Sequence, residues 1–101
     1  MRKLETRPFD AAEYLDTVAD QADLLSDAID SGDARYIAYS LGAVARARGG
    51  IGKLAREAGM SRQALHKALG ENGNPTLETV LKVLKALGLH MRIEEAPAEA
   101  A

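Results

Sequence analysis

The sequence predicts an all-α domain of five or six short helices, and three observations predict it. Apolar residues recur at intervals of three and four along most of the 101 residues, which is the spacing of one helix face. Residues that favour helix ends, namely Ser, Thr, Asp and Gly, stand between these apolar runs. The chain is 47% hydrophobic and 28% charged, which is typical of a globular protein with one modest core.

The first three helices are predicted before residue 50. Pro8 favours the first turn of a short helix that ends near Asp16. An amphipathic helix follows and stops at Ser31-Gly32, and Asp33 can cap a third helix that ends at Gly49-Gly50. The positions that support these helices are Phe9, Ala12, Leu15, Val18, Ala22, Leu25, Ile29, Ile37, Leu41, Val44, Ala45 and the apolar stem of Arg48.

The remaining helices are predicted after residue 50. Two short helices occupy residues 51–69 and are separated by Gly59-Met60-Ser61. A turn follows at residues 70–75, because Gly, Asn and Pro are concentrated there. Thr76 can cap a last helix, which ends at Gly88.

Residues 89–93 predict one short strand. Leu89, Met91 and Ile93 alternate with polar residues, which is the pattern of an extended chain with two different faces. A lone strand leaves its backbone unpaired, so we expect a second copy of the chain to pair with it in a homodimer. Residues 95–101 predict a flexible tail.

Residues 51–69 carry the most informative motif, a predicted helix-turn-helix. Such a motif needs a small residue where the helices touch, a glycine at the turn, and apolar residues that hold the second helix. Ala55 is the small residue and Gly59 can take the positive φ of the turn. Leu54 and Leu65 would hold the second helix in place. The alternative interpretation is a helical hairpin with a solvated polar face.

The second helix of this motif predicts contacts with double-stranded DNA. Its inward positions are predicted to be Ala64, Leu65, Ala68 and Leu69, which leaves the polar side chains outside. Arg can bind guanine and Gln adenine in the major groove. The predicted base-reading residues are Arg62, Gln63 and His66, and His66 is equally suited to a phosphate. The predicted phosphate-binding residues are Lys53, Arg56, Ser61 and Lys67.

Charge is distributed unevenly along the chain, although the net charge is only -2. Residues 1–40 hold four basic and nine acidic residues, a net charge of -5. Residues 41–92 hold nine basic and three acidic residues, a net charge of +6, which suits DNA phosphates. The alternative explanations are chance segregation of surface charge and, for the acidic half, an ordinary solvated helix face.

Other function classes are not favoured by the sequence. The chain has no cysteine, which excludes disulfides and thiolate sites and suits a reducing cytoplasm. The two histidines, His66 and His90, lack metal-ligand spacing, and residues 70–75 lack the ending of a phosphate loop. The N-terminus does not resemble a secretory signal, and no apolar run is long enough for a membrane span. We therefore expect a cytoplasmic protein that is not an enzyme, with no metal, cofactor or membrane.

From about Glu5 to Glu94 the chain resembles the addiction-module antidote proteins, a HigA-like branch of the helix-turn-helix antitoxins related to phage repressors of XRE type. The stretches that carry the resemblance are Arg7-Pro8-Phe9-Asp10, Ala12-Glu13-Tyr14-Leu15, Gly32-Asp33, Leu41-Gly42, Ala45-Arg46-Ala47-Arg48-Gly49, residues 65–69, Gly73-Asn74-Pro75 and residues 81–88. One departure is Gly49-Gly50-Ile51-Gly52, where repressor relatives usually carry a polar helix cap and a Gln. This departure weakens the expected backbone contact with phosphate there.

The resemblance implies a repressor-like helix-turn-helix domain over residues 1–94, with an acidic helical extension at 1–32 and a DNA-binding core at 33–94. It implies an antitoxin that neutralises a RelE/ParE/HigB-like toxin and, as a dimer, represses its own operon. The acidic half would then cover a basic toxin surface while the basic half binds operator DNA. The alternatives are a stand-alone repressor without a toxin and a protein-binding module that has lost DNA binding.

Overall fold

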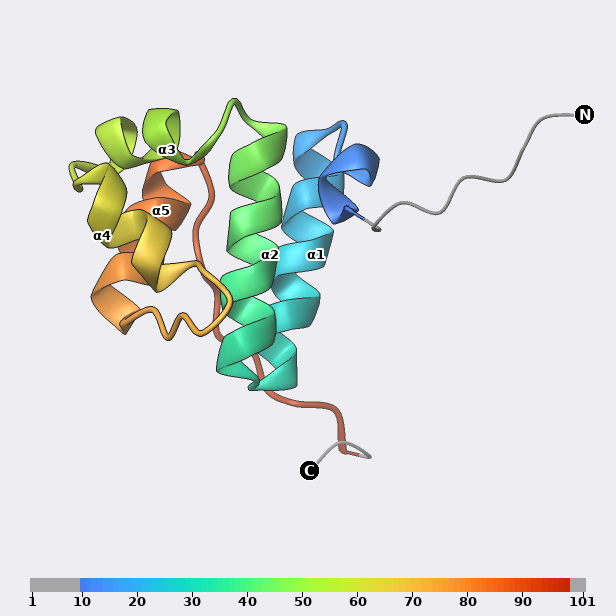
Figure 1. Cartoon of the computed structure of the whole chain (residues 1–101). Coiled ribbons are helices and arrows are strands. Elements are labelled where there is room, and N and C mark those ends of the chain that lie inside the picture. The colour runs from blue at the N-terminus through green and yellow to red at the C-terminus, as the bar shows by residue number, and fades with distance from the viewer. Residues whose placement is uncertain (1–9, 99–101) are drawn as a thin grey trace, which may run out of the picture.

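The computed structural model describes residues 10–98, and that part of the chain is built from helices alone (Figure 1). None of these helices is long and apolar enough to cross a membrane. The elements, in chain order, are the 3₁₀ helix η1 (Ala11–Tyr14) and the α-helices α1 (Val18–Ser31), α2 (Ala34–Ala47), α3 (Ile51–Ala58), α4 (Arg62–Ala68) and α5 (Leu77–Ala86). Pro8, Phe9 and residues 99–101 of the predicted tail lie outside the described residues.

The first helix ends slightly before its predicted end. Asp10 accepts a hydrogen bond from the backbone amide of Ala12 at 3.0 Å and begins η1. This helix ends at Tyr14 instead of near Asp16. Leu15 already has a non-helical backbone, with φ -112° and ψ 57°, and Thr17 is extended as the N-cap of α1.

Side-chain caps fix the starts of α1, α2 and α5. Thr17, Asp33 and Thr76 each accept a hydrogen bond from a backbone amide in the first turn of the helix that follows, at 3.0, 2.9 and 3.1 Å. Gly32 ends α1 with a φ of +72°, where a residue with a Cβ atom would be strained. The predicted caps at Asp33 and Thr76 and the predicted stop at Gly32 are therefore present.

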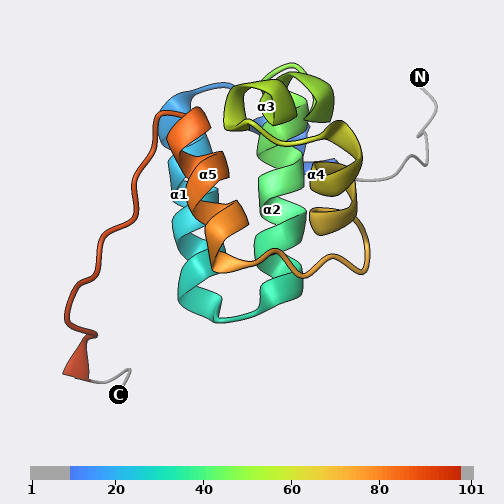
Figure 2. The same ribbon diagram turned by 90° about the vertical axis from the view of Figure 1, so that its left-hand side faces the viewer.

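Helix α2 lies at the centre of the fold, with α1 on one side and α4 on the other (Figures 1 and 2). Most of its second half is buried, and the side chains of Leu41 and Val44 are almost completely enclosed. One hydrophobic core joins η1, α1 and α2 to the later helices. Its buried members are Leu15, Leu25, Leu41, Ala43, Val44, Ala45, Leu54, Ala55, Leu65, Leu69, Val80, Val83, Leu84 and Leu87.

The strand predicted at residues 89–93 is not present in the single chain. This segment follows Gly88, which has a φ of +77°, and runs beside α1 away from the helices (Figure 2). Leu89 and Met91 are half-buried and pack against the core, as the alternating pattern requires. A strand also needs a hydrogen-bonded neighbour, and the described part of the chain offers no second extended segment to this one.

Candidate nucleic-acid interface

Helices α3 and α4 are joined by the three residues Gly59, Met60 and Ser61. Gly59 has a φ of +70°, a left-handed conformation that a Cβ atom would disfavour. The amide of Met60 then donates a hydrogen bond to the carbonyl oxygen of Ala55 at 2.9 Å. This bond gives a partner to one of the carbonyl groups that the last turn of α3 leaves unpaired. Helix α3 therefore ends abruptly, and α4 begins three residues later.

Buried apolar residues hold α4 against the rest of the fold. Leu54, Ala55 and Leu65 are 2%, 1% and 0% exposed, and they are the residues that the sequence assigned to the inside of the motif. Gly73, in the turn after α4, is also buried, and the carbonyl group of Ala68 occupies the space that a Cβ atom would need. The sequence did not predict this second contact, because the composition of residues 70–75 indicates a turn without showing what the turn touches.

The exposed side of α4 carries the three residues predicted for base reading. Arg62, Gln63 and His66 are exposed, and none of them forms a hydrogen bond or ion pair with the rest of the described chain. The side chain of Arg62 lies over Gly52 in α3, where an added Cβ atom would be 3.6 Å from its Cδ and Nε atoms. The stem of Arg62 therefore lies within contact distance of the first turn of α3.

One residue of α4 lies elsewhere than predicted. Ala64 was expected to face the core, but it is exposed. Leu65 and Leu69 are the buried positions of this helix, and a helix turns by about 100° per residue, so Ala64 is carried away from the core. Its methyl group therefore lies on the surface beside Gln63, where an apolar contact is possible.

The residues predicted for phosphate binding are also exposed. Lys53 and Arg56 lie on α3, and Lys67 lies on α4. Ser61 begins α4, and its Oγ accepts a hydrogen bond from the amide of Ala64 at 3.0 Å, which leaves the hydroxyl hydrogen able to donate. Gly50 begins α3 without a side-chain hydrogen bond. The polar helix cap that repressor relatives usually carry is therefore absent at this helix start.

Arg48, which the sequence counted within the basic half, is part of the scaffold. Its Nε donates to Oε1 of Gln21 at 2.7 Å, and its Nη2 donates to the carbonyl oxygen of Leu87 at 2.9 Å. Gln21 is itself only 4% exposed and donates to the carbonyl oxygen of Leu15. Arg48 thus joins α1 and α2 to the C-terminal end of α5, where a cation is favoured by the helix dipole. The sequence signal was its position in the apolar stripe of α2.

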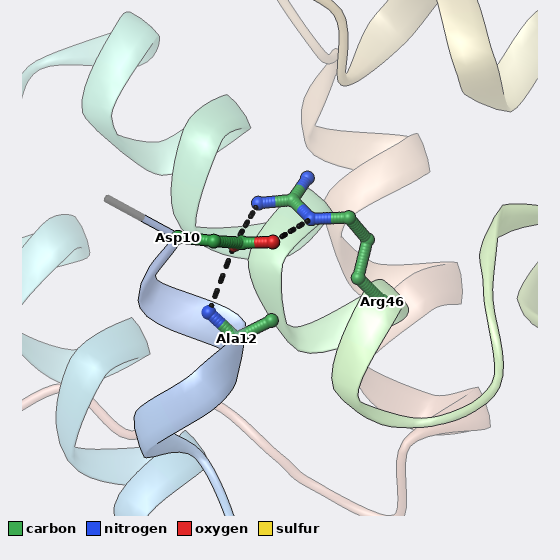
Figure 3. Close-up of polar contacts among 3 residues, drawn as sticks. All are labelled: Asp10, Ala12 and Arg46. Carbon is green, nitrogen blue, oxygen red and sulfur yellow. Dashed lines mark hydrogen bonds and ion pairs between the residues drawn. The ribbon is translucent and has the colours of Figure 1, made fainter. Parts of the chain in front are cut away.

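Arg46, also counted within the basic half, is held by Asp10 (Figure 3). The distance from its Nη2 to Oδ1 of Asp10 is 2.8 Å, and its Nε lies 3.4 Å from Oδ2. The Arg46 guanidinium, together with the Ala12 amide, holds the pKa of the Asp10 carboxyl below its usual range. This ion pair ties η1 to the last turn of α2, so Arg46 is already occupied in the isolated chain.

A row of acidic side chains lies on the opposite side of the molecule. Asp20, Asp23, Asp27 and Asp30 are spaced three and four residues apart, so they follow one side of α1, and all four are exposed. We call this set the acidic row. The described structure gives one of them a partner, because the hydroxyl group of Tyr36 donates to Asp27 at 2.6 Å. Helix α1 contains no basic residue, and α2 separates it from α4 (Figure 1).

Two comparisons with known proteins gave a match. Residues 5–95 match a family whose description is "Probable addiction module antidote protein". An uncharacterised protein of Haemophilus influenzae strain Rd is 38% identical over 92 residues, which is 91% of this chain and 94% of that protein. No solved structure matches the chain. The matched region includes both the acidic row and the α3–α4 pair.

Proposed function

The chain belongs to the family of probable addiction module antidote proteins, and from this premise we propose that it is the antitoxin of a type II toxin-antitoxin pair. In this proposal it neutralises a RelE/ParE/HigB-like toxin and, as a homodimer on operator DNA, represses its own operon. Both activities are binding events and need no catalytic step.

The observation that carries the DNA-binding part is the unpaired polar surface of α4. Arg62, Gln63 and His66 are exposed without any polar partner in the described chain, whereas Arg46 and Arg48 are held by the fold. Side chains that are free in the isolated protein can donate to base edges without first losing an internal contact. The small residue, the left-handed glycine and the buried leucines of the α3–α4 pair are what a helix-turn-helix requires.

We assign the roles as follows. Arg62 and Gln63, in the first turn of α4, bind base edges in the major groove, and His66 lies one turn further along the same side. Lys53, Arg56, Ser61 and Lys67 bind the flanking phosphates. In a two-fold dimer the two copies of α4 enter successive major grooves about 34 Å apart on a pseudo-palindromic operator.

The acidic row supplies the toxin-binding part of the proposal. Its carboxylates have no basic neighbour on α1, and they complement a toxin with a basic surface. Because α2 separates α1 from α4, the toxin and the operator would occupy different sides of the antitoxin (Figure 1). The antitoxin can then bind both at once.

One experiment tests both parts with matched variants. The purified protein, Arg62→Ala, and the triple variant Asp20→Asn, Asp23→Asn, Asp30→Asn are each titrated with the upstream DNA, a scrambled DNA and the protein encoded by the neighbouring toxin-like reading frame. Arg62→Ala should lose about 1 to 3 kcal/mol of binding free energy for the upstream DNA and keep its toxin affinity. The triple variant should lose toxin affinity and keep its DNA affinity. DNA binding by the wild-type protein should weaken steeply as the salt concentration rises.

Each variant is thus the control for the other. Equal binding of the upstream and scrambled DNA by the wild-type protein would contradict operator reading. DNA binding without toxin binding would favour a stand-alone repressor. Toxin binding without DNA binding, even at low salt, would favour a protein-binding module that has lost DNA.

A further inference from the structure

The segment after α5 is extended and has no hydrogen-bonded neighbour. Within the described residues, no backbone group from His90 to Glu94 takes part in a hydrogen bond. Leu89 and Met91 pack against the core, but Ile93, which follows on the same side of the extended chain, is 93% exposed. An extended segment with free N–H and C=O groups and an exposed apolar residue is a template for pairing with another strand.

Helix α1 does not cover this segment. A pocket of about 320 Å³ lies between them, lined on the α1 side by Leu25, Ile29 and neighbouring residues and on the other side by residues of 89–94. The segment runs beside α1 and then away from the helices (Figure 2). The backbone N–H and C=O groups of residues 90–94 are therefore available to a partner from outside the chain.

The side chains of the segment fit a second copy of the same segment in one register. If two copies pair antiparallel about a two-fold axis at Ile93, the two Ile93 side chains lie opposite each other. Each Arg92 then lies opposite Glu94 of the second copy, and these pairs of opposite charge stabilise adjacent strands. Moving the axis by one residue would oppose Arg92 to Arg92, or Glu94 to Glu94. The charges therefore select the register centred on Ile93.

We propose that residues 90–96 of two chains form an antiparallel two-stranded ribbon about Ile93, and that this ribbon closes the dimer. The proposal deepens the proposed function, because it names the surface through which the operator-binding dimer is formed. A two-stranded ribbon is only marginally stable in water, so the free dimer should dissociate on the order of micromolar concentrations. The rival surface is the exposed side of α5, where Leu77 and Leu81 are 67% and 48% exposed.

Disulfide cross-linking distinguishes the two surfaces. The chain has no cysteine, so Ile93→Cys and Leu81→Cys each carry a single thiol. Directly opposed residues of antiparallel strands have Cα atoms about 4.5 to 5.5 Å apart, which a disulfide can span. Under mild oxidation Ile93→Cys should form a covalent dimer at least about tenfold faster than Leu81→Cys. An equal or slower rate for Ile93→Cys would overturn the proposal.

A charge exchange tests the register. Arg92→Glu places like charges opposite each other twice in the dimer and should raise its dissociation constant about tenfold, as measured by sedimentation. The double variant Arg92→Glu, Glu94→Arg restores both pairs with the charges exchanged, so its dissociation constant should return close to that of the wild-type protein. A double variant that dimerises no better than Arg92→Glu would overturn the register.

These measurements are made without DNA and without toxin. A failure of the ribbon therefore leaves the DNA and toxin titrations of the proposed function unaffected. Conversely, a protein that binds neither operator nor toxin can still give the cross-link at residue 93, so the two proposals fail separately.

Discussion

The acidic helices and the α3–α4 pair are joined to the same core, but different kinds of contact fix their positions. Polar side chains tie η1 and α1 to α2 through the pairs Asp10–Arg46, Gln21–Arg48 and Asp27–Tyr36. The α3–α4 pair depends instead on two positions that favour glycine: Gly59 with its left-handed φ, and Gly73 against a carbonyl group.

This difference matches the two binding tasks that we propose. Reading base edges needs donors placed to a fraction of an ångström, and close backbone contacts supply a rigid support for them. Attraction between an acidic helix and a basic partner acts over several ångströms and tolerates small shifts of the helix. The α3–α4 pair should therefore resist substitution at Gly59 and Gly73, whereas α1 should accept changes that keep its charge.

The largest effect should come from Gly73→Ala, which tests the rigid support directly. The new Cβ atom would overlap the carbonyl group of Ala68, and backbone on both sides prevents a side-chain rearrangement from relieving the overlap. We expect the free energy of unfolding to fall by about 3 kcal/mol or more, measured by urea denaturation.

Gly52→Ala is the matched control for this substitution. Its Cβ atom would meet only the side chain of Arg62, at an ordinary 3.6 Å, and the position lies within α3. Alanine favours a helix over glycine by up to about 1 kcal/mol, so this variant should be as stable as the wild-type protein or more so. If both variants lose the same stability, close backbone contact at residue 73 is not what supports α4.

The next largest effect should come from Arg48→Met, which removes the link from α1 and α2 to the C-terminal end of α5. Methionine keeps the apolar stem but leaves Oε1 of buried Gln21 and the carbonyl oxygen of Leu87 without their donor. We expect a loss of about 2 kcal/mol in the free energy of unfolding. Arg48→Lys should recover part of it, because an ammonium group can reach one acceptor but not span both. No loss in Arg48→Met would mean that water replaces the guanidinium.

The sequence predicted those features of the fold that depend on neighbours along the chain. The caps at Asp33 and Thr76 and the glycine stop at Gly32 follow from local hydrogen bonding and backbone freedom, and they are present. The first helix ends before its predicted end, because Leu15 leaves the helical conformation, and the cap at Thr17 that begins α1 was not recognised. The strand at residues 89–93 was predicted from alternation alone, and alternation cannot show whether a neighbour exists within the same chain.

The candidate site was predicted as a set of residue types, and its tertiary contacts were not. The exposed polar residues of α4 follow from helical periodicity, but Ala64 was wrongly assigned to the buried side of the helix. The roles of Arg48 and Gly73 depend on Gln21, Leu87 and Ala68. Gln21 and Leu87 are far from Arg48 in the sequence, and no local pattern predicts these contacts. Which cations remain without an internal partner therefore had to come from the structure.

The smallest effect should come from Asp10, whose exposed ion pair attaches η1. Hydrogen bonding from Arg46 chiefly lowers the pKa of Asp10 in the folded protein, and the Ala12 amide adds to this. A carboxyl group with a lower pKa in the folded state stabilises the fold above its unfolded pKa of about 4. That contribution is lost as the pH falls through the folded value. Asp10→Asn should therefore lower the melting temperature slightly at pH 7, and the difference from wild type should shrink towards pH 2.

The same difference should shrink in about 1 M salt at pH 7, because exposed charges are screened within a few ångströms at that concentration. The melting temperatures of Asp10→Asn and the wild-type protein, measured across pH and salt, test both expected decreases. No difference between Asp10→Asn and wild type at any pH or salt would show that Asp10 acts as the cap of η1, which Asn retains, and not through the charge of Arg46. In that case a backbone contact would attach η1 as well, and the contrast between the two regions would hold only for α1.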